Sequence, residues 1–408
     1  MPLREEQFCV YLYEQLVGRL HRRNDVTRFV FDSGYWNDPR RSVLGLRFED
    51  NPHGRHQSHL RLPPWFSNLL PEGRLRDWIA EERGTSIKRE MELLAQVGHD
   101  LPGAVRVIAA DQTVPVDLTA LGDAHPEQGK ALNALWSFSL AGVGLKFSLL
   151  AQGDRLTIPG IGEGGDWIVK LPDPFYPEVP RNELAMMSLA RTVGIETPPA
   201  RLVHRDEVES LPPRVWPVGE NFAYAVKRFD RGAEREPIHI EDFAQVRDFY
   251  PDQKYSGSYE TLGALIYRGR DVEALREFAR RLAFNILIGN GDAHLKNWSL
   301  IYRNPRVPTL APAYDLVATF IYRPETEGPE EMALKFGGSK RFEAVRLFHF
   351  SRLDKRLGAN AELSGVVRSL VDQVLAEWPA AAAVLQSCPE LCGKIEATLR
   401  NRASRLIG

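Results

Sequence analysis

The sequence predicts an α+β protein with two lobes, preceded by a small α/β subdomain. Strand patterns dominate residues 138–171 and 222–229, and helical periodicity dominates from about residue 242 onward. A polar, proline-containing stretch separates this region from a mixed first part. The 408 residues are enough for two or three domains. We place a subdomain at 1–110, a linker at 111–134, an N-lobe at 135–235 and a helical C-lobe at 236–408.

Composition excludes several classes of protein. The formal net charge is −2 and hydrophobic residues make up 43% of the chain, so the basic excess of a free-standing nucleic-acid binder is absent. Three cysteines are too few for a disulfide framework, and no apolar run reaches membrane-spanning length. Arg4, Glu5 and Glu6 interrupt any N-terminal signal sequence. We therefore expect a cytoplasmic protein that does not bind membranes.

The first part of the chain should contain short strands and helices. Residues 27–31 alternate as a strand does, and residues 69–82 have helical spacing. Thr85 and Ser86 are candidate caps for a second helix, which Gly98 should end. The pattern of residues 100–105 predicts a turn followed by another strand.

The strongest chemical signal lies in residues 285–297, where an apolar helix ends at Gly289 and a polar loop follows. The loop carries Asp292 and Asn297, and Asp315 follows Asn297 by 18 residues, beyond a short strand. Phosphoryl transfer requires one carboxylate to accept the proton of the attacking hydroxyl and oxygen ligands to hold Mg²⁺ against the phosphates of ATP. We assign the first role to Asp292, and the metal to Asn297 and Asp315.

Two further residues of this loop carry chemistry. We expect His294 to order the loop beside the nucleotide rather than to catalyse. Lys296 either contacts phosphate, as one of the catalytic residues, or is a solvated loop charge; the sequence leaves both readings open. Aspartate and asparagine also cap loops for purely structural reasons, but the whole array with Asp315 at this spacing favours catalysis.

A lysine stands inside an apolar strand upstream of this array. Lys170 lies in residues 167–172, and Glu183 lies in a helix predicted over 182–193. A lysine in such a strand is unusual unless it is paired. A strand lysine that binds the α- and β-phosphates and is held by a helix glutamate is the protein-kinase arrangement. The pair indicates a nucleotide-binding lobe, with residues 223–230 as the hinge whose backbone would bind adenine.

These residues resemble the HipA family of bacterial toxin kinases, and the resemblance covers nearly the whole chain. The motifs that carry it are residues 64–73 (PWFSNLLPEG), 98–105 (GHDLPGAV), 139–142 (SLAG) with Lys146, 168–172 (IVKLP), 182–183 (NE), 227–231 (KRFDR), 289–297 (GNGDAHLKN) and 314–315 (YD). The last two motifs are the most specific.

The resemblance implies a bilobal, distantly protein-kinase-like fold and a Ser/Thr kinase that uses ATP and Mg²⁺. It also implies nucleotide-binding residues in a phosphate loop and a hinge, namely Ala141, Gly142, Lys146, Lys227 and Phe229. Two positions depart from the family pattern. Gly144 stands where the family often has Gln, and Lys227 stands where it often has Glu.

The resemblance further implies partners and regulation. Family members phosphorylate translation components, typically aminoacyl-tRNA synthetases, and arrest growth. A small helix-turn-helix antitoxin of the HipB type restrains them and makes the contact with operator DNA. They autophosphorylate a serine of the phosphate-loop segment, which maps to Ser139, with Ser137 as a second acceptor.

Two alternatives stay open from the sequence. A small-molecule phosphotransferase of the aminoglycoside-kinase kind also places Asp before His and Asn in one loop. A repressor-complex subunit that has lost catalysis would keep the fold alone.

Overall fold

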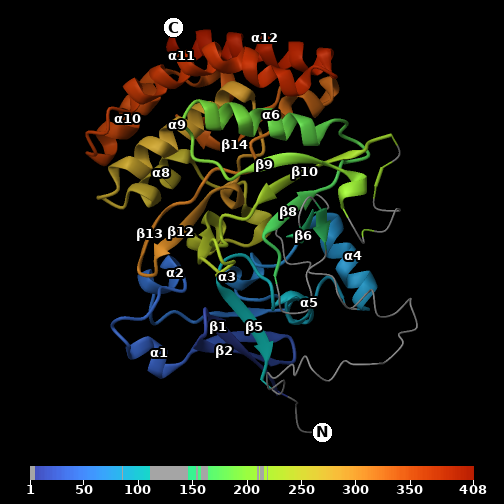
Figure 1. The fold of residues 1–408 in the computed structure, drawn as a ribbon. Helices are drawn as coiled ribbons and strands as arrows, with labels where there is room; N and C mark the ends of the chain where they lie inside the picture. Colours follow the sequence, from blue (N-terminus) through green and yellow to red (C-terminus); the bar gives the residue numbers. More distant parts are fainter. Residues whose placement is uncertain are drawn as a thin grey trace.

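The computed structural model describes residues 5–84, 86–110, 146–152, 155–157, 164–208, 211, 216–217 and 219–408. The predicted linker lies outside these residues, and so do Ser137, Ser139, Ala141 and Gly142. In Figure 1 the chain runs from a small sheet at one end of the molecule, through a second sheet, to a layer of helices at the other end. The α+β prediction is confirmed.

A five-stranded antiparallel sheet forms the first part, which we call the N-terminal subdomain; its strand order is β4-β3-β2-β1-β5. The strands are β1 Glu5–Leu12, β2 Gln15–Arg23, β3 Val26–Phe31, β4 Gln57–His59 and β5 Val105–Ala109. Its helices are α1 Ser33–Asn37, α2 Leu46–Asp50, α3 Pro64–Ser67, α4 Gly73–Arg83 and α5 Glu90–Val97. Aromatic side chains, including Phe29, Phe48 and Trp65, fill the core between the sheet and these helices.

Two helix predictions in this subdomain were wrong in their bounds. Residues 69–82 do not form one helix, because Pro71 has no amide hydrogen and disfavours a helical conformation in the residue before it. The next helix begins at Glu90 rather than after Ser86, and it ends at Gly98 as expected. The buried Glu90 carboxylate accepts hydrogen bonds from the Leu62 N–H and the Ser67 hydroxyl, so a tertiary contact accompanies the later start.

The second sheet, with helix α6, is called the N-lobe here; its strand order is β7-β6-β8-β10-β9. The elements are β6 Lys146–Gln152, β7 Arg155–Thr157, β8 Trp167–Lys170, α6 Val179–Thr192, β9 Ala200–His204 and β10 Phe222–Lys227. Lys146 pairs with Lys170, and Lys170 pairs with Tyr224, so these three side chains lie on one face of the sheet. The other face, with Phe147 and Val169, packs into the core of the N-terminal subdomain.

The C-lobe comprises the remaining elements and is mainly helical. Its strands are β11 Ile240–Asp242, β12 Ser299–Asn304, β13 Val307–Leu310, β14 Glu331–Phe336 and β15 Ser339–Arg341. Its helices are α7 Phe243–Val246, α8 Tyr259–Tyr267, α9 Val272–Ile288, α10 Leu347–Leu357, α11 Leu363–Ala381 and α12 Pro389–Ile407. Helix α9 is buried for most of its length, and its apolar residues share one core with those of α6, α11 and α12. The helical character predicted for this lobe is therefore found.

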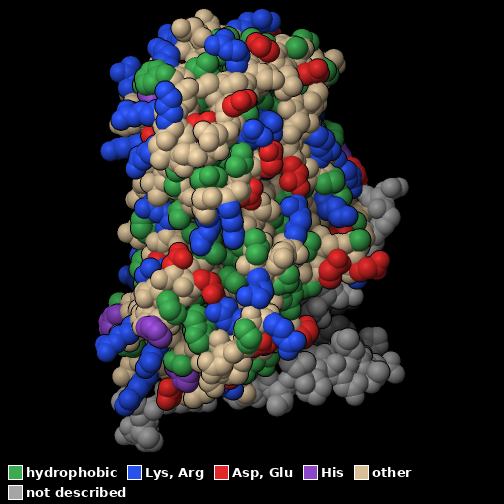
Figure 2. Space-filling view, turned by 90° about the vertical axis from the view of Figure 1, so that its left-hand side faces the viewer, with side chains coloured by type: hydrophobic (Ala, Val, Ile, Leu, Met, Phe, Trp, Pro, Cys, Tyr) green, Lys and Arg blue, Asp and Glu red, His purple; other side chains and the backbone are tan. Residues whose placement is uncertain are grey.

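The face of the molecule drawn in Figure 2 is of mixed charge. Figure 2 shows Lys and Arg side chains interspersed with Asp and Glu over the face in view. Within the described part of the chain, no helix has both the length and the apolar character that crossing a membrane requires.

Candidate active site

A cavity of about 770 Å³ lies where the three parts of the molecule meet. All predicted site residues that the structure describes line it, namely Lys146, Lys170, Glu183, Lys227, Phe229, Asp292, His294, Lys296, Asn297 and Asp315. Helices and strands far apart in the sequence thus bring the predicted groups together. The roles assigned to these residues stay predictions.

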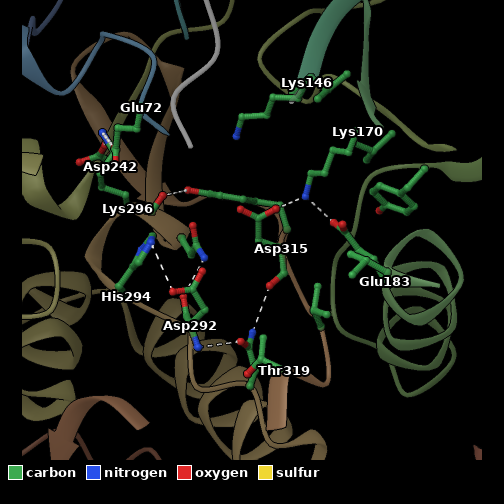
Figure 3. A pocket seen from close by; sticks show the side chains of 18 of the residues that line it. Glu72, Lys146, Lys170, Glu183, Asp242, Asp292, His294, Lys296, Asp315 and Thr319 are labelled. Atoms are coloured by element: carbon green, nitrogen blue, oxygen red, sulfur yellow. Dashed lines mark hydrogen bonds and ion pairs between the residues drawn. The ribbon is translucent and has the colours of Figure 1, made fainter. Parts of the chain in front are cut away.

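Lys170 forms the link between the N-lobe and Asp315. From β8 its Nζ donates to Glu183 Oε1 on α6 at 2.5 Å, and it also contacts Asp315 Oδ1 (Figure 3). Burial by itself would lower the pKa of Lys170, but the two carboxylates outweigh it and raise that pKa above its ordinary value. Lys170 therefore stays a cation, and the expected strand-lysine and helix-glutamate pair is present.

Asp315 has two lysines for neighbours. Burial would raise its pKa, yet Lys170 and Lys146 lower the pKa well below the usual range, so the carboxylate is ionised. Its backbone has φ 55°, a left-handed conformation that a residue with a side chain seldom adopts. The Asn290 side chain donates to the Asp315 carbonyl at 3.1 Å, which fixes this turn.

Residues 289–297, called the Asp292 loop below, begin where Gly289 ends α9 with φ 69°. Asn290 organises the loop: its Nδ2 donates to Asn285 Oδ1 at 2.8 Å, and its Oδ1 accepts from the Asp292 N–H at 3.0 Å. Thr319 Oγ1 accepts from the Gly291 N–H at 2.7 Å. Sequence reasoning assigned no role to Asn290 or Thr319, although Asn290 lies within the quoted motif.

The Asp292 carboxylate is half exposed at the mouth of the cavity. Its Oδ1 accepts a hydrogen bond from the Tyr255 hydroxyl at 2.6 Å, a contact that sequence reasoning missed. The neighbouring His294 is buried, and burial lowers its pKa to about 4, so the imidazole is neutral at physiological pH. Its ring packs edge-on against Tyr255, with 5.1 Å between ring centroids, in keeping with the loop-ordering role expected for it.

Lys296 is not a solvated loop charge, and that alternative was wrong. Its side chain is 4% exposed, and its Nζ donates to the backbone oxygen and side-chain Oδ1 of Asn68 at 2.8 and 3.1 Å. The same ammonium lies 3.2 Å from Glu72 and 3.3 Å from Asp242. Local sequence could not reveal this, because Asn68 lies 228 residues away.

The oxygens of Asn297 and Asp315 are chemically suited to a hard divalent cation. Asn297 Nδ2 donates to the Asp292 carbonyl at 2.8 Å, which leaves Asn297 Oδ1 as the possible ligand atom. An ionised carboxylate and an amide oxygen are ligands that Mg²⁺ accepts while it keeps several waters. This donor set therefore fits the metal that the sequence predicted.

The predicted hinge follows β10. The N–H groups of Lys227 and Arg228 donate to Pro199 O and Asp166 O, both at 2.8 Å, and the amide of the next residue, Phe229, is the candidate donor to a purine. The Phe229 ring lies 5.5 Å from the ring of Tyr314, beside Asp315.

A buried ionic cluster, which the sequence did not reveal, fixes the hinge to the N-terminal subdomain. Arg228 donates to Asp230 at 2.8 and 2.9 Å and to Asp100 at 3.0 Å, and its side chain is completely buried. Arg231 also reaches both aspartates. Arg228, Asp230 and Arg231 belong to the 227–231 motif, and Asp100 belongs to the 98–105 motif, so the two motifs bind one another.

Comparison with known proteins identifies the family. The profile described as "HipA-like C-terminal domain" matches residues 138–378, and the "HipA N-terminal domain" matches residues 8–108. The chain belongs to the HipA family. The family prediction is thereby confirmed.

Relatives of this HipA-family chain carry kinase names. "Putative kinase Y4dM" of Sinorhizobium fredii is 43% identical over 388 residues, which cover 91% of both chains. "Serine/threonine-protein kinase toxin HipA" of Shewanella oneidensis is 27% identical over 351 residues, which cover 77% of this chain and 75% of the relative.

A solved structure, titled as the Shewanella oneidensis toxin–antitoxin system HipA, HipB and its operator DNA complex, aligns with a TM-score of 0.75. The alignment covers 98% of this chain and 97% of that one at 20% identity. This likeness establishes the fold, so the predicted bilobal HipA-type architecture is confirmed.

Proposed function

We propose that this chain is an ATP- and Mg²⁺-dependent Ser/Thr protein kinase that acts as the toxin of a toxin–antitoxin pair. The observation that carries the proposal is the convergence of Lys170, Asp292, Asn297 and Asp315 on one cavity. Phosphoryl transfer depends almost entirely on positioning and charge stabilisation, and this set supplies a cation, a base and two metal ligands. The kinase names of the relatives support the same activity.

Each residue has a role that its contacts suit. Lys170, held by Glu183, binds the α- and β-phosphates, and Lys146 adds positive charge on the same face of the sheet. Asn297 and Asp315 would hold Mg²⁺, which would supply positive charge to neutralise the phosphates of ATP. Asp292 accepts the proton of the acceptor hydroxyl through Oδ2, because Tyr255 occupies Oδ1.

Family membership supports our proposals for the substrate, the regulation and the partners. We propose that the acceptor is a serine or threonine of a translation protein, in particular an aminoacyl-tRNA synthetase. Ser139, with Ser137 as the second choice, is the proposed site of autophosphorylation. A HipB-like helix-turn-helix antitoxin is the proposed partner, supported by the complex named for the structural relative, and operator DNA is reached through it.

The test is an Asp292→Asn variant incubated with radiolabelled ATP and Mg²⁺. We expect label on Ser139 or on a tRNA synthetase with the parent protein, and a loss on the order of 10²–10⁴-fold with the variant. Asp252→Asn is the matched control, since Asp252 is an exposed aspartate that pairs with Arg61 on the surface.

Two outcomes would count against the proposal. Label that appears only on a small metabolite would indicate a small-molecule phosphotransferase. An Asp292→Asn variant as active or as toxic on expression as the parent would remove Asp292 from the mechanism.

A further inference from the structure

The Asp292 loop is anchored by residues from a different part of the molecule. The Lys296 ammonium, four residues after Asp292, has lost nearly all contact with water and depends on its acceptors in the protein. Asn68 supplies two hydrogen-bond acceptors and Glu72 supplies an ion-pair partner, and both residues belong to the N-terminal subdomain. Figure 3 shows Glu72 beside Lys296 and Asp242, on the opposite side of the cavity from Lys170.

Glu72 also holds a second lysine. Its Oε2 accepts from Lys254 Nζ at 2.9 Å, while its Oε1 lies 3.2 Å from Lys296 Nζ. Lys254 directly precedes Tyr255, whose hydroxyl donates to Asp292. The Glu72 carboxylate thus contacts two lysines that are each connected to Asp292, the predicted base. Lys296 lies in the same loop as Asp292, and Lys254 is next to Tyr255, which donates to Asp292.

The charges of this cluster balance. Two lysines, Lys254 and Lys296, face two carboxylates, Glu72 and Asp242, and none of the four side chains is more than 13% exposed. Burial alone would raise the pKa of Glu72, but Lys296 and Lys254 lower it to about 2, so Glu72 is ionised at physiological pH. Removing its charge leaves two buried ammonium groups with one carboxylate, an imbalance that favours displacement of Lys296 and, with it, of the Asp292 loop.

We propose that Glu72 is a positioning residue through which the N-terminal subdomain sets the place of Asp292. This role rests on the kinase function proposed above. The N-terminal subdomain then contributes to catalysis, because its Glu72 carboxylate determines the position of Asp292 relative to the acceptor hydroxyl.

The test variant is Glu72→Gln, which keeps the shape of the side chain and removes its charge. We expect kcat for phosphate transfer from ATP to fall on the order of 100-fold, because small misplacements of a catalytic group have effects of that size. The KM for ATP should change less than about threefold, since Lys146, Lys170 and the hinge belong to the N-lobe. In hydrogen–deuterium exchange, amides 290–297 should exchange faster than in the parent.

Glu241→Gln is the matched control. Glu241 has a completely buried carboxyl group that joins the same two parts of the molecule: it accepts from the Leu46 N–H at 2.9 Å, from Trp65 Nε1 at 3.2 Å and from the Tyr302 hydroxyl. It does not line the cavity. We expect this variant to leave kcat and the exchange of residues 290–297 as in the parent.

A double variant separates positioning from a general loss of stability. If Glu72 acts through Lys296, Glu72→Gln combined with Lys296→Met should have a kcat no lower than that of Lys296→Met alone. If Glu72→Gln does not fold, Glu72→Asp replaces it as the test variant. The aspartate keeps the negative charge, but its carboxylate lies one methylene group further from the two lysines. We expect a loss of about tenfold for that variant.

The inference is overturned if Glu72→Gln leaves both kcat and the exchange of residues 290–297 unchanged, or if Glu241→Gln alters them equally. A parent protein that transfers no phosphate would remove the kinase proposal instead. The exchange experiment still decides the role of Glu72 in that case, because it requires no activity.

Discussion

Replacing Arg228 by methionine tests whether the hinge is held by the buried ionic cluster. The side chain is completely buried and donates to both carboxylate oxygens of Asp230, to Asp100, to the Ser148 hydroxyl and to the Leu101 carbonyl, at 2.8–3.2 Å. With Arg228→Met, both aspartates keep their ion pairs with Arg231 but lose those with Arg228. Removal of one partner from a buried charge pair typically costs about 3–5 kcal/mol, and we expect a loss of unfolding free energy in that range.

Urea unfolding followed by tryptophan fluorescence measures this loss. Arg201→Met is the control, because Arg201 pairs with Glu207 at 2.8 Å while both side chains are more than a third exposed. Pairs of that kind contribute less than about 1 kcal/mol. Adding Asp230→Asn to Arg228→Met should recover part of the loss, since it removes the excess negative charge. A loss below about 1 kcal/mol for Arg228→Met would refute the reasoning.

Two further predictions concern the loop and the core. Gly289→Ala should lower the free energy of unfolding more than Gly194→Ala does. Both glycines have a positive φ, but only at Gly289 would an added Cβ lie 2.3 Å from Arg402 Nη1. Equal losses for the two variants in urea unfolding would contradict the predicted clash. Burial raises the pKa of Glu241 to about 7 from an ordinary 4.5, so the folded state retains a proton that the unfolded state releases. The free energy of unfolding of the parent, relative to that of Glu241→Gln, should therefore fall by on the order of 3 kcal/mol as pH rises from about 4.5 to 7. Urea unfolding of both proteins at a series of pH values measures this difference in free energy. A difference that stays constant or increases with pH would contradict the prediction.

The sequence predicted the parts of the site that local pattern determines. Lys170 and Glu183 lie on a strand and the helix that follows it, so their meeting required only that both elements form and pack. The Asp292 loop was predictable for the same reason, because the apolar periodicity of α9 and Gly289 mark where the loop begins.

The remaining contacts join segments that no local pattern connects. In the sequence Lys296 resembles an exposed loop residue, and its role as a buried anchor follows from distant partners such as Asn68 and Glu72. The basic run at residues 19–23 is a second example, because its sequence is compatible both with a solvated surface and with a binding patch. In the folded chain it lies in β2, where Arg22 contacts Glu6 on the neighbouring strand and Glu92 on α5. Such long-range pairs follow from tertiary packing and cannot be read from spacing.

The end of α9 also depends on a residue made late in synthesis. Arg402, on α12, donates to the Ile286 carbonyl at 3.0 Å and so satisfies a carbonyl in the last turn of α9, directly before the Asp292 loop. Because a chain emerges from the ribosome N-terminus first, this contact is missing until residue 402 has been released. We therefore expect a nascent chain to complete the end of α9, and the Asp292 loop that follows it, only after Arg402 has left the ribosome, although Ile286 was made 116 residues earlier.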